Sequence, residues 1–372
     1  MMSSVDRQMM SRALQLAAKG RFTSSPNPSV GCVIAIADQV VAEGYTRPAG
    51  GNHAEIEALQ AGADVTGGTA YVSLEPCSHQ GKTGPCADAL IAAGISRVVI
   101  ACEDPNPEVA GAGIEKLKQA GVEVQVGLLD DQARESNKGF IKRYEQGTPW
   151  VTVKMAASLD GRTAMASGQS QWITTPASRA DVQRLRAASC AIITGIGTQL
   201  MDDPSLTVRI TNTDVGVEDQ LRQPLRVVVD GQLQMSPQAR LLQQPGDTLI
   251  ATLDGAEQRD KASALIAAGA EVVFLSALGQ HIDLQALLLT LAERGCNQVL
   301  VEAGAGLAGG FIAEGLLDEL VCYWAPKLFG HTARPMFDLP IETIDAHLAL
   351  SVEDIRQIGE DIRVTLRPDK DY

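Results

Sequence analysis

Residues 53–86 read HAEIEALQAGADVTGGTAYVSLEPCSHQGKTGPC, and this stretch decides how the first half of the chain is interpreted. It contains one imidazole and two thiols, from His53, Cys77 and Cys86, and a carboxylate, Glu55, two residues after the histidine. A zinc ion that activates water takes three protein ligands and keeps one open position, and nitrogen and thiolate ligands suit it. The stretch therefore predicts a catalytic zinc site, with Glu55 free to carry protons without binding the metal.

A structural zinc site is the alternative interpretation. It takes four protein ligands, and His79, two residues after Cys77, is the candidate for the fourth. Two cysteines taken alone are ordinarily small buried side chains. The structural reading leaves Glu55 without a role, so we interpret the site as catalytic. The order of residues is similar to the zinc nucleobase deaminase signature, H-x-E followed by P-C-x-x-C, except that eight residues, 78–85, separate the two cysteines.

Strands and helices alternate through the first 146 residues, which predicts an α/β layer structure with a mostly parallel sheet. Strands are expected at 30–36 and 40–45, joined by a hairpin at Ala37-Asp38-Gln39, and at 70–74, 97–102 and 122–126. Helices are expected at 7–19, 53–61, 86–93 and 113–120. Two of these helices begin at His53 and Cys86, so their N-termini are expected to face the metal and to favour thiolate.

Gly147-Thr148-Pro149 interrupts the pattern and predicts a boundary between domains 1–147 and 148–372. The second half is again α/β, with strands expected at 150–155, 191–194, 225–230, 248–252, 271–275, 298–302 and 320–325, and helices at 178–188, 258–268, 283–293 and 308–314. Residues 211–223 are polar and predict a surface loop.

Two features of the second half indicate anionic, nucleotide-like ligands. Residues 304–309, GAGLAG, fit G-x-G-x-x-G after a predicted strand, which is typical of a diphosphate loop or of a tight strand-to-helix turn. Lys154, Arg179, Arg186 and Arg209 are candidate phosphate contacts, and ordinary surface ion pairs are the alternative for any one arginine.

Composition excludes several partners. The net charge of −14 argues against a broad nucleic-acid surface, which needs a basic face. No apolar run approaches the roughly 18 residues that span a bilayer. The five cysteines outside the predicted metal site lie mostly in apolar runs, as expected of buried thiols in a reducing compartment, and we expect a cytoplasmic protein.

The chain resembles the RibD family of riboflavin-biosynthesis deaminase–reductases over essentially its whole length. The resemblance rests on Pro26-Asn27-Pro28, Val30-Gly31-Cys32, His53-Ala54-Glu55, Glu75-Pro76-Cys77-Ser78-His79, Gly81-Lys82-Thr83-Gly84-Pro85-Cys86, Ser158-Leu159-Asp160-Gly161, Ser170-Gln171-Trp172-Ile173-Thr174, residues 202–209 and Val301-Glu302-Ala303-Gly304. The long loop between the cysteines is characteristic of this family. It separates the family from cytidine and tRNA deaminases.

The resemblance implies a cytidine-deaminase-like three-layer domain followed by a dihydrofolate-reductase-like domain. It implies zinc and NADPH as cofactors, pyrimidine ribotides as substrates and a homo-oligomer, dimer or tetramer. The implied reactions are hydrolytic deamination of 2,5-diamino-6-ribosylamino-4(3H)-pyrimidinone 5′-phosphate and then reduction of its ribosyl side chain, giving 5-amino-6-ribitylamino-uracil 5′-phosphate.

The resemblance also implies site residues. Glu55 is catalytic and Asn27 holds the deaminase substrate, while a phosphate contact by Lys82 is our own hypothesis. The implied cofactor contacts are Ala156, Trp172, Thr198, Asp202, Gly304, Ala305, Gly306, Leu307, Ala308, Gly309 and Gly310. The implied contacts to the reductase substrate are Ser170, Arg186, Leu206, Arg209 and Glu302. We further hypothesise that Arg186 and Arg209 hold its phosphate and that Asp202 orients or protonates the sugar.

Two other classes of function stay open. One is a zinc deaminase for another nucleotide, with a second domain that only binds or regulates. The other is a zinc-stabilised protein without enzymatic activity. The sequence does not identify the side chain that selects NADPH over NADH.

Overall fold

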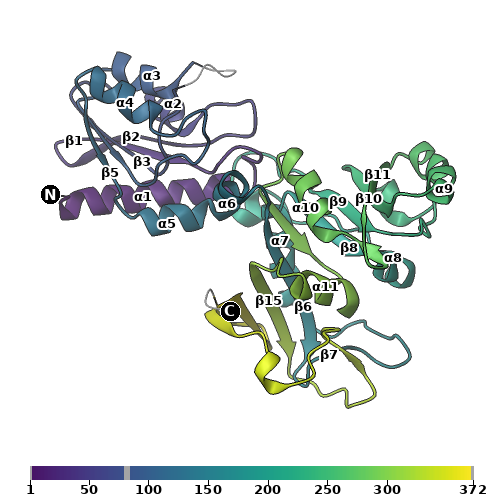
Figure 1. The fold of residues 1–372 in the computed structure, drawn as a ribbon. Coiled ribbons are helices and arrows are strands. Elements are labelled where there is room, and N and C mark those ends of the chain that lie inside the picture. The colour runs from purple at the N-terminus through teal and green to yellow at the C-terminus, as the bar shows by residue number, and fades with distance from the viewer. Residues whose placement is uncertain (1, 79–83, 370–372) are drawn as a thin grey trace. The chain divides into compact units, whose positions relative to one another are not determined.

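The structure is a computed structural model that describes residues 2–78 and 84–369. The chain divides into two compact units (Figure 1). The first consists of Met1–Gly147 with Thr211–Leu221, and the second of Thr148–Ile210 with Arg222–Tyr372. Part of the polar segment predicted as a surface loop thus belongs to the first unit, where Glu218 forms an ion pair with Arg47 at 3.0 Å. Each unit is described by itself.

The first unit is a three-layer α/β structure around a five-stranded sheet of order β2-β1-β3-β4-β5. Its strands are β1 (Gly31–Ile36), β2 (Gln39–Tyr45), β3 (Thr69–Val72), β4 (Arg97–Ile100) and β5 (Glu123–Val126). Its helices are α1 (Ser4–Gly20), α2 (Ala54–Leu59), α3 (Cys86–Ala92), α4 (Ala112–Gln119), α5 (Asp130–Ser136) and α6 (Lys138–Gln146), with a 3-10 turn η1 (Thr213–Val215). Helices α1 and α5 lie on one face of the sheet, and α2, α3 and α4 on the other (Figure 1).

Strand direction in this sheet differs from the expectation of a mostly parallel sheet. The β1–β2 and β1–β3 pairs are antiparallel, and only β3–β4 and β4–β5 are parallel. The reason is the hairpin at residues 37–38, which returns the chain at once instead of sending it through a helix. The hairpin itself was predicted and is confirmed.

Glycine allows α2 to lie directly on the sheet. A Cβ added at Gly44 in β2 would lie 2.5 Å from the carbonyl oxygen of Ala54 and 2.6 Å from the nitrogen of Ala58. Real Cβ atoms do not approach so closely, so any other residue would push α2 outward. The position of α2, and of His53 at its start, therefore depends on the absence of a side chain at residue 44.

The second unit contains a nine-stranded sheet of order β11-β10-β9-β8-β14-β6-β15-β18-β17. Its strands are β6 (Trp150–Ser158), β8 (Ala191–Gly195), β9 (Leu225–Val229), β10 (Thr248–Leu253), β11 (Glu271–Leu275), β14 (Gln298–Val301), β15 (Glu319–Ala325), β17 (Leu350–Ile358) and β18 (Asp361–Pro368). The sheet is parallel from β11 to β15, as predicted, and antiparallel at β18 and β17.

Helices and short strands complete this unit. The helices are α7 (Pro176–Ala188), α8 (Ile196–Asp202), α9 (Ala256–Ala267), α10 (Leu284–Glu293) and α11 (Ala305–Ala313), with 3-10 turns η2 (Arg240–Gln243) and η3 (Ile344–Ala346). The short strands are β7 (Arg162–Ala164), β12 (Ala277–Leu278), β13 (His281–Ile282) and β16 (Arg334–Pro335). Among the described residues, no helix combines the length and apolarity that a membrane span requires.

The glycine motif of the second half is mostly helix. Gly304 caps α11, and residues 305–310 form its first turns, so the expected helix start at 308 is three residues late. The motif contains a tight strand-to-helix turn from β14 into α11, as one of its two interpretations predicted. Gly309 is needed for packing, because a Cβ there would lie 2.1 Å from the carbonyl oxygen of Asp338.

Candidate functional site

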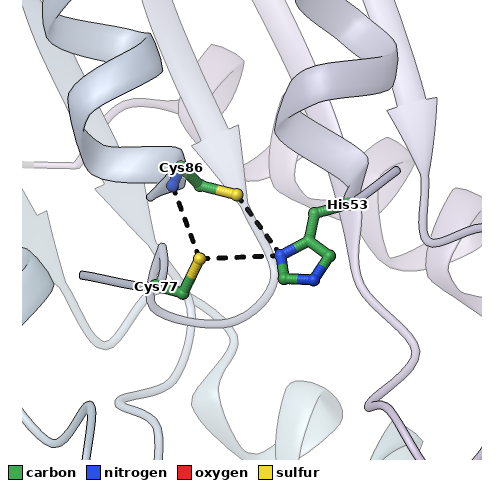
Figure 2. Close-up of side chains that lie close together, drawn as sticks. All are labelled: His53, Cys77 and Cys86. Carbon is green, nitrogen blue, oxygen red and sulfur yellow. Dashed lines mark hydrogen bonds between the residues drawn. The ribbon is translucent and has the colours of Figure 1, made fainter. Parts of the chain in front are cut away.

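Three side chains of the first unit converge as the sequence predicts (Figure 2). His53 Nδ1 lies 3.4 Å from Cys86 Sγ and 3.6 Å from Cys77 Sγ, and all three candidate ligand atoms lie within 4.8 Å of one another. Zinc bonds of about 2.3 Å to sulfur and 2.1 Å to nitrogen place neighbouring tetrahedral ligands roughly 3.6 Å apart. The three residues therefore fit a zinc ion. His79 and Lys82 lie outside the described residues.

Helix starts position two of the three ligands, as expected. His53 is the N-cap of α2, and Cys86 is the first residue of α3, directly after Pro85. The backbone N–H of Cys86 donates to Cys77 Sγ at 3.4 Å. Hydrogen bonds from Cys86 and His53 lower the pKa of Cys77. The thiolate that a metal requires therefore forms readily at Cys77.

Glu55 lies beside these ligands in the second position of α2, where it is only 3% exposed. Burial raises the pKa of this carboxyl to about 7. The pKa of the Cys86 thiol is raised by its interaction with Cys77, by burial and then by the nearby charge of Glu55. The carboxyl is thus enclosed at the metal centre, as the sequence indicated.

Glu75 holds the segment after β4 against the cysteine loop, a role that the sequence analysis did not assign. Its carboxylate accepts backbone N–H groups of Gly113 at 2.9 Å, Gly111 at 3.0 Å, Ile114 at 3.2 Å and Asp104 at 3.3 Å. The same residue precedes Pro76 and Cys77, so one side chain fixes two neighbouring loops. The signal in the sequence was an acid placed directly before the Pro-Cys pair.

A large groove of about 1660 Å³ crosses the second unit at the carboxyl ends of its parallel strands. Its lining comes from the ends of β10, β9, β8, β14, β6 and β15. At about 4.8 Å between strands, those six strands span roughly 24 Å. Extended ligands bind α/β sheets at this edge.

The groove collects the predicted site residues of this half, with one exception. Its lining includes Ala156, Ser170, Trp172, Thr198, Asp202, Leu206, Arg209, Arg186, Glu302, Gly304, Ala305, Gly306, Leu307, Gly309 and Gly310. Ala308 is fully buried in the core instead, because it faces inward from α11. Asn27 lies in the first unit, half-buried in the turn before β1.

One end of the groove is strongly charged. Arg186 donates to both carboxylate oxygens of Glu302, at 2.5 and 3.0 Å, and to the carbonyl oxygen of Thr207 at 3.1 Å. Burial raises the pKa of Glu302, but Arg186 and Lys154 lower it by more, so this carboxylate stays ionised. Burial lowers the pKa of Lys154. Lys154 was named only as a general candidate from sequence, and it lines the same end of the groove.

The glycine-rich start of α11 offers backbone donors to the groove. No side chain caps this helix, and the first N–H groups of a helix have no partner within it. A Cβ at Gly306 or at Gly197 would meet nothing within 4 Å, so both glycines leave space open. Unpaired N–H groups at the start of a nine-residue helix fit a diphosphate.

Comparisons with known proteins match both halves of the chain. Residues 3–102 match the cytidine and deoxycytidylate deaminase zinc-binding region, and residues 149–364 match the RibD C-terminal domain. Both matches follow the order predicted for the two halves.

Two curated relatives are similar to this chain over nearly its whole length. The riboflavin biosynthesis protein RibD of Escherichia coli K12 is 47% identical, with 96% of this chain and 98% of that protein covered. The Haemophilus influenzae protein of the same name is 45% identical, with 98% of each covered.

Solved structures extend the likeness to the fold. Acinetobacter baumannii RibD superposes with a TM-score of 0.89 at 41% identity, covering 98% of this chain and 99% of that one. A Thermotoga maritima protein described as a diaminohydroxyphosphoribosylaminopyrimidine deaminase and 5-amino-6-(5-phosphoribosylamino)uracil reductase has a TM-score of 0.85 at 31% identity, with the same coverage. The cytidine-deaminase-like first domain, the reductase second domain and the zinc and nicotinamide cofactors expected from the sequence are thereby supported. The chain belongs to the RibD family of bifunctional deaminase–reductases of riboflavin biosynthesis.

Proposed function

We propose that the first unit hydrolyses the 2-amino group of 2,5-diamino-6-ribosylamino-4(3H)-pyrimidinone 5′-phosphate and that the second reduces the ribosyl group to ribityl with NADPH. The observation that carries the proposal is the imidazole and two thiols at zinc-ligand spacing with a buried carboxyl beside them. The description of the Thermotoga maritima relative supports the choice of substrates. NADPH rather than NADH follows from the family resemblance.

In the deaminase, the protein positions the proton carrier. A zinc ion held by His53, Cys77 and Cys86 supplies a water that is nucleophilic at neutral pH. Glu55 takes one proton from the attacking water and delivers it to the ring nitrogen, and it later transfers the remaining proton of that water to the leaving amine. Its burial in α2 fixes the carboxyl beside the reacting carbon and excludes bulk water. Asn27 orients the pyrimidine, and Lys82 offers charge to the phosphate.

In the reductase, the charged end of the groove receives the sugar phosphate. Arg209 is the main phosphate contact, since no hydrogen bond from its guanidinium is found within the described part of the chain. Arg186 has three of its five donors committed to Glu302 and Thr207, so it contributes charge and its remaining N–H groups.

NADPH held in the groove would supply a hydride for C1′ of the opened sugar. Lys154 is the better proton source for the ring oxygen, because it is half-buried within the influence of the Glu302 charge whereas Asp202 is exposed. Asp202 then orients the sugar. The start of α11 holds the cofactor's diphosphate through the N–H groups of Ala305, Gly306 and Leu307, while Ala156, Trp172 and Thr198 line its path.

A second copy of the chain covers the outer edge of the larger sheet, giving the homo-oligomer that the family resemblance implies. Strand β17 is the last strand of that sheet, and no strand of the described residues pairs with its outer edge. Its Val352 and Ile355 are 57% and 65% exposed. An edge strand with two exposed apolar side chains among polar ones can still pair with another strand. Sedimentation of the wild type and of Ile355→Lys tests this, with a monomeric wild type as the contradicting result.

The purified chain with zinc and the diaminopyrimidine ribotide tests the proposed reactions. Ammonia release is expected without NADPH, and NADPH oxidation only after deamination has occurred. Ammonia release with no NADPH oxidation would support a deaminase with a regulatory second domain. Release of neither product would support a zinc-stabilised protein without activity.

A further inference from the structure

A chain of polar side chains lies beneath α7 in the second unit. The hydroxyl of Tyr323 in β15 donates to Asp181 Oδ2 at 2.6 Å, and Arg363 in β18 donates to the same oxygen at 2.9 Å. Tyr323 is completely buried in the floor of the groove. Burial and the hydrogen bond to Asp181 raise its pKa, so the phenol stays protonated and keeps donating at physiological pH.

Helix α7 is held to the sheet mainly by directional polar contacts. Its start is fixed by Asp361, which accepts from the backbone N–H and hydroxyl of Thr175 at 2.8 and 2.7 Å and from the hydroxyl of Ser178 at 2.6 Å. The buried apolar cluster beneath it is small, with Val182 of α7 packed against Val321 and Tyr323. Apolar contacts tolerate small shifts, whereas charge-assisted hydrogen bonds fix direction and distance. The hydrogen bonds that Asp181 accepts from Tyr323 and Arg363 thus fix the position of the middle of α7 on the sheet.

The same helix carries the phosphate end of the groove. Two residues after Asp181, Gln183 Oε1 accepts the backbone N–H of Arg209 at 2.9 Å. Arg186 donates to the carbonyl oxygen of Thr207 at 3.1 Å. A displacement of α7 therefore moves Arg186 directly, and moves Arg209 through Gln183.

We propose that Tyr323 is a positioning residue for the reductase: by holding Asp181 it sets α7, and through α7 it sets the two arginines that receive the substrate's phosphate. The proposal rests on the proposed reductase function and on the roles of Arg186 and Arg209 within it. Tyr323 takes no part in hydride or proton transfer.

The test compares Tyr323→Phe with the wild type in the full chain. The substitution keeps the ring and removes one donor, and Arg363 still holds Asp181. We expect the KM for the phosphorylated reductase substrate to rise about 10-fold, in line with the cost of misplacing a binding group by a fraction of an ångström. The kcat, the KM for NADPH, the deaminase rate and the KM for the dephosphorylated substrate should stay within about twofold, since none depends on the two arginines.

Two further variants separate positioning from general loosening of the helix. Ser178→Ala removes one hydrogen bond at the start of α7, far from Arg186, and should leave the KM for the phosphorylated substrate unchanged. Asp181→Asn weakens the same contact from the other side. Its effect combined with Tyr323→Phe should be clearly less than the product of the two single effects, because the variants remove one shared interaction. If Tyr323→Phe does not fold, Asp181→Asn with the Ser178→Ala control carries the test.

The outcomes distinguish this proposal from the proposed function. A wild type that never oxidises NADPH with this substrate would overturn the function. An active wild type with an unchanged KM in Tyr323→Phe would overturn only the positioning role. An equal rise for the phosphorylated and dephosphorylated substrates, or the same rise in Ser178→Ala, would also overturn it.

Discussion

The metal centre of the first unit and the groove of the second are built in opposite ways. The centre takes its three candidate ligands and its proposed proton carrier from residues 53–86, and both helices concerned begin at a candidate ligand. The groove takes its lining from residues 154–340, mostly where successive parallel strands end. A site that depends on the identity of a few side chains is local in sequence. A site that depends on the edge of a sheet is set by topology.

Removal of one metal ligand should have the largest effect. Cys86→Ser replaces a thiolate with a hydroxyl that binds zinc poorly, so we expect loss of zinc and a fall in deamination of about 10³-fold or more. Reduction of the deaminated substrate should remain, because the groove contains no part of the centre. Zinc content and the two rates measured separately check this. Cys102→Ser, another buried cysteine of this unit, is the control and should keep its zinc. An equal fall in the rates of deamination and reduction would contradict the view that the two sites act independently.

Binding of the phosphorylated substrate in the groove should depend on several charged residues, so that loss of one has a smaller effect. Arg209→Ala is expected to raise the KM for the phosphorylated reductase substrate by about 10- to 100-fold, the range for one hydrogen bond between charged groups. Steady-state kinetics with the deaminated substrate measure it. Arg184→Ala, an exposed arginine on the same helix as Arg186, is the control and should behave as wild type. A matching rise in the KM of the deaminase would contradict the assignment.

Glu75 tests how far the metal centre depends on its surroundings. Glu75→Gln removes the charge that accepts four backbone N–H groups and leaves some of them unpaired. We expect a loss of about 2 kcal/mol in the free energy of unfolding, together with weaker zinc binding. Urea unfolding with zinc titration measures both quantities. Glu115→Gln on the surface of α4 should change neither.

The smallest effect concerns acid stability of the first unit. Hydrogen bonds from Arg97, with those from Ser3 and Tyr71, hold the pKa of Asp6 well below its ordinary range. A carboxyl group whose pKa is lower in the folded than in the unfolded state stabilises the fold at pH values above the unfolded pKa of about 4. This contribution is lost as the pH falls below that value. Asp6→Asn should therefore lower stability by about 1 kcal/mol at pH 7 and flatten the fall below pH 4. Thermal unfolding across pH measures this. If stability fell with pH below pH 4 as steeply in Asp6→Asn as in the wild type, the prediction would be wrong. Asp88→Asn, which removes a carboxylate from an exposed ion pair, is the control.

The same contrast explains what the sequence could predict. The strands of both sheets that have buried apolar runs were expected, as were the hairpin and the ligand-bearing helix starts, because these depend on short patterns. The β17–β18 hairpin was missed because most side chains of β17 are exposed and form no apolar alternation. Helices α5, α6 and α8 were also missed. In α8 the buried residue is Gln199, whereas Leu200 and Met201 are exposed, so no apolar stripe marks this helix. Helix α5 follows Leu129, which has a positive φ.

The two sites also differ in how far short sequence patterns could predict them. The three candidate zinc ligands were predicted from their spacing and lie together in the structure. The candidate groove contacts came from the family resemblance, because only the folded sheet brings those residues to one edge. Glu75, the enclosure of Lys154 and the Tyr323–Asp181 contact depend on burial and on partners distant in sequence. No short pattern encodes such contacts.

The most direct test of the central claim, a zinc centre that depends on a separate proton carrier, is Glu55→Gln assayed for zinc and for both reactions. We predict one zinc per chain as in the wild type, deamination lowered about 10²- to 10⁴-fold, and reduction of the deaminated substrate unchanged. A variant that keeps its zinc and deaminates at nearly the wild-type rate would contradict the account.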